Sequence, residues 1–196
     1  MIPPNQSRME RVLADLANEA SIPKFHYIKK TCQEAIEFIS SPNASDIPVH
    51  QLRNRCLQPF QMALETRTKR LSNLAIKGIE LILQDDQFQS NLESESEEDW
   101  MPIQILNTVY STPHLQEDAQ VEILKLLLNM TFSTAWCMNS KIIIEISQVY
   151  IKIFVGGTIS VQTAIKATIT QMLSCFTKRL QETVEKNKVP RVCSLL

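Results

Sequence analysis

Three histidines and a pair of adjacent carboxylates are the side chains of this sequence that could perform acid–base or metal chemistry. His26, His50 and His114 stand alone, without the Cys or carboxylate neighbours that a metal site needs at short spacing. Asp85 and Asp86 open a strongly polar stretch, so hydration explains them better than catalysis. The common phosphate-binding, dinucleotide-binding, esterase and zinc-protease motifs do not occur. The sequence therefore predicts no active site, no metal and no cofactor.

The acidic segment SESEED, from Ser94 to Asp99, matches a modification pattern. Ser94 and Ser96 each have an acidic residue three positions later, which is the spacing that acidophilic kinases favour. The same composition is also typical of a solvated acidic connector that is never modified. We expect an acidic loop over residues 85–99, with Ser94 and Ser96 as candidate phosphorylation sites.

The last four residues, CSLL, begin at Cys193 and fit the C-a-a-X pattern with a terminal Leu. This pattern predicts geranylgeranylation of Cys193, and three basic residues shortly before it would supply a second membrane signal. Ser194 departs from the pattern, which prefers an aliphatic residue there, and the motif works only if Leu196 is the native C-terminus. A small prenylated peripheral membrane protein is therefore an alternative hypothesis.

Charge is distributed unevenly along the 196 residues, although the formal net charge is only −1. Residues 1–77 carry +4, residues 78–124 carry −11 and residues 125–196 carry +6. This layout biases encounters with charged partners, but a nucleic-acid binder would show an overall basic excess. The five cysteines form no C-x-x-C pair, as is typical of reduced thiols in the cytosol. The apolar runs contain charges and are too short to span a bilayer.

Apolar residues recur every three or four positions throughout the chain, which predicts amphipathic helices. The longest such set predicts a helix over 160–186 that packs against 121–132 and 142–153: Ile165, Ile169, Met172, Phe176, Leu180 and Val184. Ser7 is a possible N-cap of the first helix. Pro59 should kink its helix or begin a new one, and Gly78 lies on an apolar face where another helix could approach closely. Tyr110 is expected on the apolar face of the 100–111 helix.

The later helices are expected to form pairs that repeat roughly every 48 residues, close to the period of HEAT and armadillo units. The predicted pairs are 50–67 with 69–84, 100–111 with 117–133, and 140–155 with 160–186. Because one helical pair cannot cover its own apolar face, neighbouring pairs must stack. We expect an all-α fold of armadillo/HEAT-like stacked helical pairs, an α-solenoid.

The order and spacing of three segments resemble a known family: LQPFQMALETRTKRLSNLAIKGIELIL, QILNTVYSTPHLQEDAQVEILKLLLNMTFS and TAIKATITQMLSCFTKRL. This family is the N-terminal dimerisation and cyclophilin-binding (DCB) domain of the large, brefeldin A-inhibited, Golgi-type Arf guanine nucleotide-exchange factors. TAIKATITQML is the most specific block, and LQEDAQVEILKLLL with its short acidic linker resembles the divergent third member of the class. Residues 9–186 would form the DCB-like domain. Residues 1–8 would be an extension or an expression remnant, and residues 187–196 a tail.

The resemblance implies a non-catalytic regulatory domain of a much larger protein. Family members self-associate, contact the neighbouring homology-upstream domain and in some cases bind an Arf-like GTPase at the trans-Golgi network. The resemblance thus implies a cytoplasmic chain that reaches trans-Golgi or vesicle membranes indirectly, through protein partners. The exchange domain lies far downstream in such proteins, and nothing in this sequence matches it.

Basic side chains are the candidates for a docking surface. One cluster surrounds a predicted interhelical turn and contains Arg67, Lys69, Arg70 and Lys77. A second cluster lies on the polar side of the last helix and contains Lys178 and Arg179. Ordinary solvated charge is the alternative interpretation of both clusters. An autonomous enzyme is disfavoured because the sequence brings together no nucleophile–base pair and no metal ligands.

Overall fold

The computed structural model describes residues 7–43, 46–89, 96–133 and 139–188, of which 179, 180 and 182–188 are described as backbone alone. Within these ranges the chain forms eight α-helices and no strand. The helices are α1 (Arg8–Glu19), α2 (His26–Ile39), α3 (Val49–Glu65), α4 (Lys69–Gln84), α5 (Met101–Thr108), α6 (Glu117–Phe132), α7 (Ser140–Gly156) and α8 (Ile159–Lys188). The predicted all-α class is confirmed.

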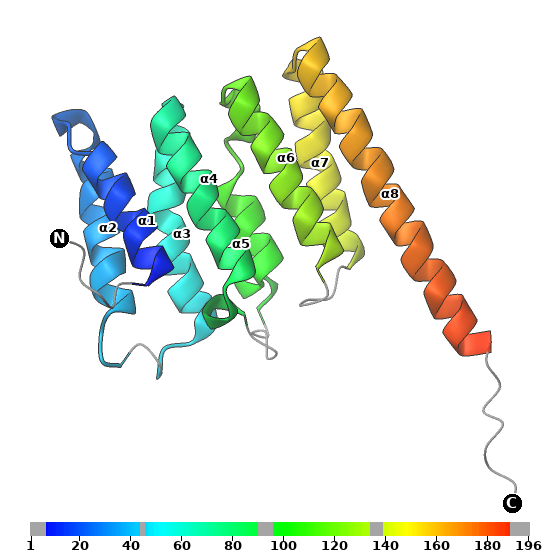
Figure 1. Cartoon of the computed structure of the whole chain (residues 1–196), viewed down its shortest axis with the longest axis horizontal. Helices are drawn as coiled ribbons and strands as arrows, with labels where there is room; N and C mark the ends of the chain where they lie inside the picture. Colours follow the sequence, from blue (N-terminus) through cyan, green and yellow to red (C-terminus); the bar gives the residue numbers. More distant parts are fainter. Residues whose placement is uncertain (1–6, 44–45, 90–95, 134–138, 189–196) are drawn as a thin grey trace, which may run out of the picture.

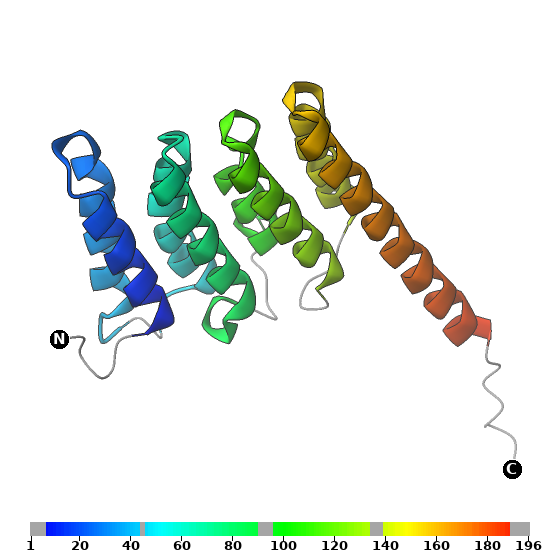
Figure 2. The same ribbon diagram turned by 45° about the horizontal axis from the view of Figure 1, so that its top comes forward.

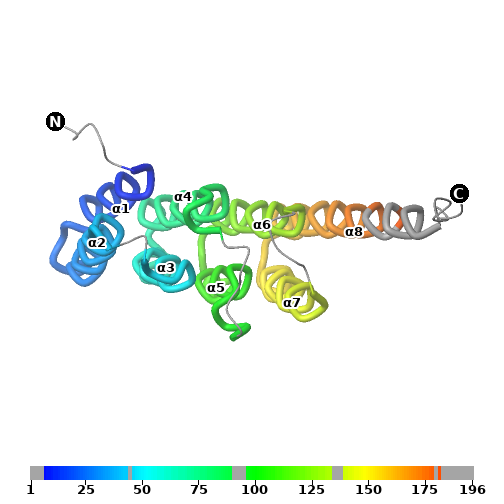
Figure 3. Tube along the Cα trace, turned by 90° about the horizontal axis from the view of Figure 1, so that it is seen from below, coloured from blue at the N-terminus to red at the C-terminus, as the bar shows by residue number. Residues whose placement is uncertain are grey.

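The helices stand side by side in two layers (Figures 1 and 2). One layer contains α1, α4, α6 and α8, and the other contains α2, α3, α5 and α7, as the view along the helices shows (Figure 3). Each of the three predicted pairs contributes one helix to each layer, and each pair packs on the one before it. The shared core runs between the layers and contains residues of every helix. This arrangement is that of an α-solenoid.

Local signals set the beginning of α1. The Ser7 hydroxyl accepts a hydrogen bond from the Glu10 backbone N–H at 3.1 Å, and the Glu10 carboxylate accepts one from the Ser7 N–H at 3.1 Å. This reciprocal pair satisfies two backbone donors that the first turn of a helix leaves without partners. The predicted Ser7 cap is confirmed.

The predicted close approach at Gly78 is confirmed as well. A Cβ atom at Gly78 would overlap the ring of Phe60, which is fully buried on α3. The absence of a side chain at Gly78 therefore lets the Phe60 ring lie directly against the α4 backbone. This contact fixes the spacing within the α3–α4 pair.

Helix α8 packs where the sequence predicts. It contacts both α6 and α7, with Ile165 and Met172 buried and Ile169 and Phe176 packed on the edge of the core. The side chains of Leu180 and Val184, the last two of the predicted set, lie outside the described residues. Figure 1 shows the final turns of α8 extending past the end of α6.

Of the two outcomes predicted at Pro59, a kink or a new helix, the second does not occur, because α3 continues through Pro59 as one element. Buried residues on both sides of Pro59 hold the two halves in the same core. The expectation for Tyr110 needs correction. Tyr110 is 71% exposed and not on a buried face. Because α5 ends at Thr108, Tyr110 lies beyond the last helical turn and leaves the apolar face that the spacing assigned to it.

No helix among the described residues is both long enough and apolar enough to cross a membrane.

Candidate functional site

The first basic cluster surrounds the turn between α3 and α4. Arg67, Lys69, Arg70 and Lys77 are all exposed, and the first three lie within one turn of each other. Lys77 is two helical turns further along α4, roughly 10 Å from Arg70 by the rise of an α-helix. Arg67 adopts the left-handed conformation, with φ 56°, and its N–H donates to the Leu64 carbonyl at 3.0 Å, which closes the turn.

Two members of this cluster form ion pairs with neighbouring helices. Lys69 Nζ lies 2.7 Å from an Asp118 carboxylate oxygen at the start of α6, and Arg70 Nη1 lies 3.6 Å from Glu19 of α1. The hydrogen bond and positive charge of Lys69 lower the pKa of Asp118. Arg67 and Lys77 form no ion pair with the side chains that the structure describes. Their charges are therefore available to a partner.

The other sequence candidates do not join this cluster. Lys178 is exposed on α8, far along the chain from the α3–α4 turn, and the Arg179 side chain lies outside the described residues. Ser96 is exposed directly before a short 3-10 helix, Glu97–Asp99. Ser94 and Cys193, and with Cys193 the CSLL motif, lie outside the described residues.

A buried arginine, which the sequence analysis did not single out, ties α3 to both ends of the acidic segment. Arg53 has no exposed surface. Its Nη1 donates to the Phe88 carbonyl at 2.9 Å, its Nη2 to the Asp99 carbonyl at 2.7 Å, and its Nε to the Gln104 side-chain oxygen at 2.8 Å. The Gln104 amide then donates to the His50 carbonyl at 2.9 Å. We call these groups the Arg53 network.

A signal for this network was present in the sequence. Arg53 precedes Cys56 by three positions and Phe60 by seven, so it shares their apolar face, and Gln104 interrupts the apolar run MPIQIL. A long polar side chain on a buried face must find hydrogen-bond partners. The network has a structural role: it holds the segments before and after residues 90–95 against α3.

The cysteine and histidine side chains that could react include thiols buried in the core and imidazoles exposed on the surface. Burial raises the pKa of the Cys32 and Cys56 thiols to about 12, so both remain protonated and unreactive near neutral pH. His26 and His114 are exposed. Within the described part of the chain, no three His, Cys, Asp or Glu side chains come together as metal ligands would.

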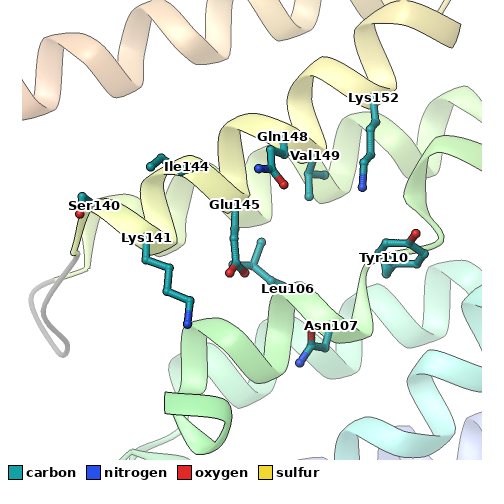
Figure 4. Close-up of a pocket in the computed structure, with 10 residues that line it drawn as sticks. All are labelled: Leu106, Asn107, Tyr110, Ser140, Lys141, Ile144, Glu145, Gln148, Val149 and Lys152. Carbon is teal, nitrogen blue, oxygen red and sulfur yellow. The ribbon is translucent and has the colours of Figure 1, made fainter.

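A groove of about 470 Å³ separates α5 from α7 (Figure 4). Tyr110 and Asn107 lie along its α5 side, and Lys152 of α7 reaches over the Tyr110 ring, with Nζ 4.9 Å from the ring centre. Glu145 also faces the groove, and Lys141 pairs with Glu97 at one end. The groove's mixture of aliphatic, aromatic and charged groups is suited to contact with a protein.

The fold and the candidate sites define a class: a helical-repeat domain whose described surfaces are suited to binding other proteins. The chain matches the family described as Mon2/Sec7/BIG1-like, dimerisation and cyclophilin-binding domain (DCB), over residues 6–184. It is 37% identical over 180 residues to brefeldin A-inhibited guanine nucleotide-exchange protein 3 of Homo sapiens. The protein of that name from Mus musculus is equally similar over the same length.

This chain therefore belongs to the DCB family. The aligned region covers 90% of this chain but only 8% of each of the two relatives. The resemblance inferred from the sequence is confirmed, including the similarity to the third member of the class. The family description names dimerisation and binding and no catalytic activity.

Proposed function

We propose that this chain is a non-catalytic regulatory and interaction domain of a large Arf guanine nucleotide-exchange factor. It acts by self-association, by docking to a neighbouring homology-upstream domain and by binding protein partners, such as an Arf-like GTPase, that bring it to trans-Golgi or vesicle membranes. The observation that carries this proposal is the family match over 6–184, which includes nearly the whole helical array.

The physical form of the chain supports the proposal. An α-solenoid presents a long surface made by many helices, which suits protein docking better than the enclosed pocket of an enzyme. The exposed basic residues Arg67 and Lys77, with Lys69 and Arg70 beside them, would favour an acidic surface on the partner. Lys69 and Arg70 would exchange their present ion pairs for contacts with that partner. Lys178 and Arg179 form a second candidate contact.

Binding to an Arf-like GTPase tests the docking part of this proposal. We expect the purified chain to bind the GTP-loaded form in preference to the GDP-loaded form, measured by biolayer interferometry. Reversing the charges of Arg67, Lys69 and Arg70 to Glu should weaken binding about tenfold or more, because it replaces attraction by repulsion at three sites.

The matched control reverses three exposed lysines elsewhere, Lys24, Lys29 and Lys30, which changes the net charge equally and should leave binding within about twofold. Equal losses in the two triple variants would show non-specific attraction and would refute the assigned surface. Nucleotide exchange on Arf should stay at its uncatalysed rate when this chain alone is added, and a faster rate would refute the non-catalytic assignment.

A further inference from the structure

Helix α7 has two apolar faces, and only one of them packs against the core. Its buried residues are Ile142, Ile146, Tyr150 and Ile153. On the opposite face Ile144 is 56% exposed, Ile151 is 60% exposed and Val155 is 79% exposed. Together with Gln148 they step by four, three and four residues, which aligns them along one line of the helix. We call Ile144, Gln148, Ile151 and Val155 the α7 stripe.

The α7 stripe has the spacing of a helix–helix interface. Steps of three and four residues place side chains on the seam by which two helices pack together. Helix α7 is the last helix of its layer, and its outer side is left uncovered by α5 and α8 (Figure 3). Single exposed apolar residues are ordinary on a protein surface, but an aligned set on one terminal helix indicates a contact site.

Two charged residues beside the stripe indicate which partner fits. Glu145 and Lys152 line the α5–α7 groove together with Ile144 and Gln148 of the stripe (Figure 4). Because they are seven residues apart, Glu145 and Lys152 lie on the same flank of the stripe, separated by two helical turns. Lys152 stacks over Tyr110, and the negative charge of Glu145 contributes to raising the pKa of Lys141. Glu145 makes no ion pair within 4 Å among the described side chains.

A twofold axis perpendicular to two antiparallel helices brings their equivalent flanks together, as in any symmetric homodimer. With that axis between Gln148 and Val149, Glu145 of each copy lies opposite Lys152 of the other. The same operation places Ile144 of one copy near Ile151 and Val155 of the other. A parallel arrangement would instead bring opposite flanks together and leave Glu145 and Lys152 apart. The flank is therefore self-complementary only when the helices run antiparallel.

We propose that this chain dimerises through antiparallel pairing of α7 with α7 of a second copy. The α7 stripe forms the apolar centre of that interface, and two symmetric Glu145–Lys152 pairs form its polar edge. This inference rests on the self-association in the proposed function and assigns the surface that performs it. It makes no use of the basic cluster at the α3–α4 turn.

The first test measures mass by sedimentation equilibrium on the full chain. The wild-type chain should be dimeric at about 50 µM, in the range of modest interfaces. Ile151→Asp should give a monomer at that concentration, because it places a charge in the apolar centre. The matched control is Ile22→Asp, at a residue 50% exposed near the other end of the molecule, which should remain dimeric. Circular dichroism checks that both variants keep their helix content.

Charge exchange then tests the antiparallel register. Glu145→Lys and Lys152→Glu should each raise the dimer dissociation constant about fivefold to twentyfold, because each places like charges opposite one another. The double variant E145K/K152E restores opposite charges across the axis and should return to within about threefold of wild type. A double variant as weak as the two single changes would overturn the proposed register.

A cross-link locates the axis. Two helices that pack 8–10 Å apart bring residues at the axis within disulfide range, so Gln148→Cys should give a covalent dimer on mild oxidation, whereas Gln33→Cys on α2 should not. A monomeric wild-type chain, or a dimer unaffected by Ile151→Asp, would overturn this inference. Neither result changes the GTPase-binding measurement, on which the docking part of the proposed function stands or falls.

Discussion

Arg53 shows how one buried charge can order segments that are distant in sequence. Its guanidinium contacts residues 35, 46 and 51 positions away. The guanidinium is a planar fork of N–H donors that only arginine can supply. Its acceptors are carbonyl and amide oxygens. The guanidinium therefore joins α3 to the two segments on either side of residues 90–95. The energetic cost of burying its charge is offset only while all of these acceptors remain in place.

We predict that Arg53→Lys destabilises the chain by about 2–4 kcal/mol, because an ammonium cannot reach all of these acceptors and leaves some of them buried without partners. The measurement is urea unfolding followed by circular dichroism. Arg55→Lys is the control on the same helix, since Arg55 is exposed, and it should change stability by less than about 0.5 kcal/mol. Equal effects of the two changes would mean that the Arg53 network contributes nothing specific.

The two buried thiols predict how stability changes at high pH. Burial raises the pKa of the Cys32 and Cys56 thiols from an ordinary value of 9.0 to about 12. Thiolates therefore form in the unfolded chain at a lower pH than in the folded one. Their contribution to stability is complete below pH 9 and is lost as the pH rises from 9 toward 12.

Changing Cys32 and Cys56 to Ala should therefore flatten the fall of stability between pH 9 and pH 11, although the variants start from a lower stability because of the cavities. Urea unfolding across that range measures the slope. At pH 8, a thiol reagent should label Cys32 and Cys56 of the wild-type chain only after unfolding. Rapid labelling of the native chain would show that the two thiols are accessible and contradict their burial.

At the level of the elements, Gly78 and Phe60 set the distance between α3 and α4. We predict that Gly78→Ala destabilises the chain by about 1–3 kcal/mol, because the new methyl group overlaps the Phe60 ring. Gly156→Ala is the control, since nothing lies within 4 Å of a Cβ at that position. It should be neutral or slightly stabilising, because alanine favours a helix.

A double-mutant cycle separates this overlap from the intrinsic difference between Gly and Ala. In a Phe60→Leu background the smaller side chain leaves room for the methyl group, so Gly78→Ala should cost less than it does in the wild-type chain. Thermal and urea unfolding of the four chains give the coupling free energy. A coupling near zero would mean that the ring and the α4 backbone are not in contact.

The elements also show what the sequence could and could not predict. Spacing alone placed Ile165 and Met172 on the buried face of α8, because helical period and burial are both local properties. It misplaced Tyr110, since the end of α5 depends on backbone hydrogen bonds that apolar spacing does not report. The buried role of Arg53 was not predicted, because its hydrogen-bond acceptors come from other segments and such contacts exist only in the folded chain. The α7 stripe was not predicted either. The spacing showed one apolar face of that helix and could not show that a second apolar face stays uncovered.

At the scale of the whole molecule, stability should vary from one end of the array to the other. Helical pairs in a solenoid contact only their neighbours, so stability is approximately a sum of local terms and interface terms. Helices α1 and α2 pack on α3 and α4, whereas α7 and α8 pack on α5 and α6 at the opposite end. The first pair and the last pair lie at opposite ends of the array (Figure 1). The two ends should therefore open independently.

We predict that Ile146→Ala in α7, a loss of about 2–4 kcal/mol at a fully buried residue, reduces amide protection in α7 and α8 but not in α1 and α2. Ile28→Ala, at an equally buried residue of α2, is the matched change at the other end and should give the reverse pattern. Native-state hydrogen exchange read by mass spectrometry distinguishes the two. If either substitution lowered protection evenly along the chain, the array would unfold as one cooperative unit. A dimer formed through α7 would then stabilise every helix equally, whereas local opening confines that stabilisation to the C-terminal pairs.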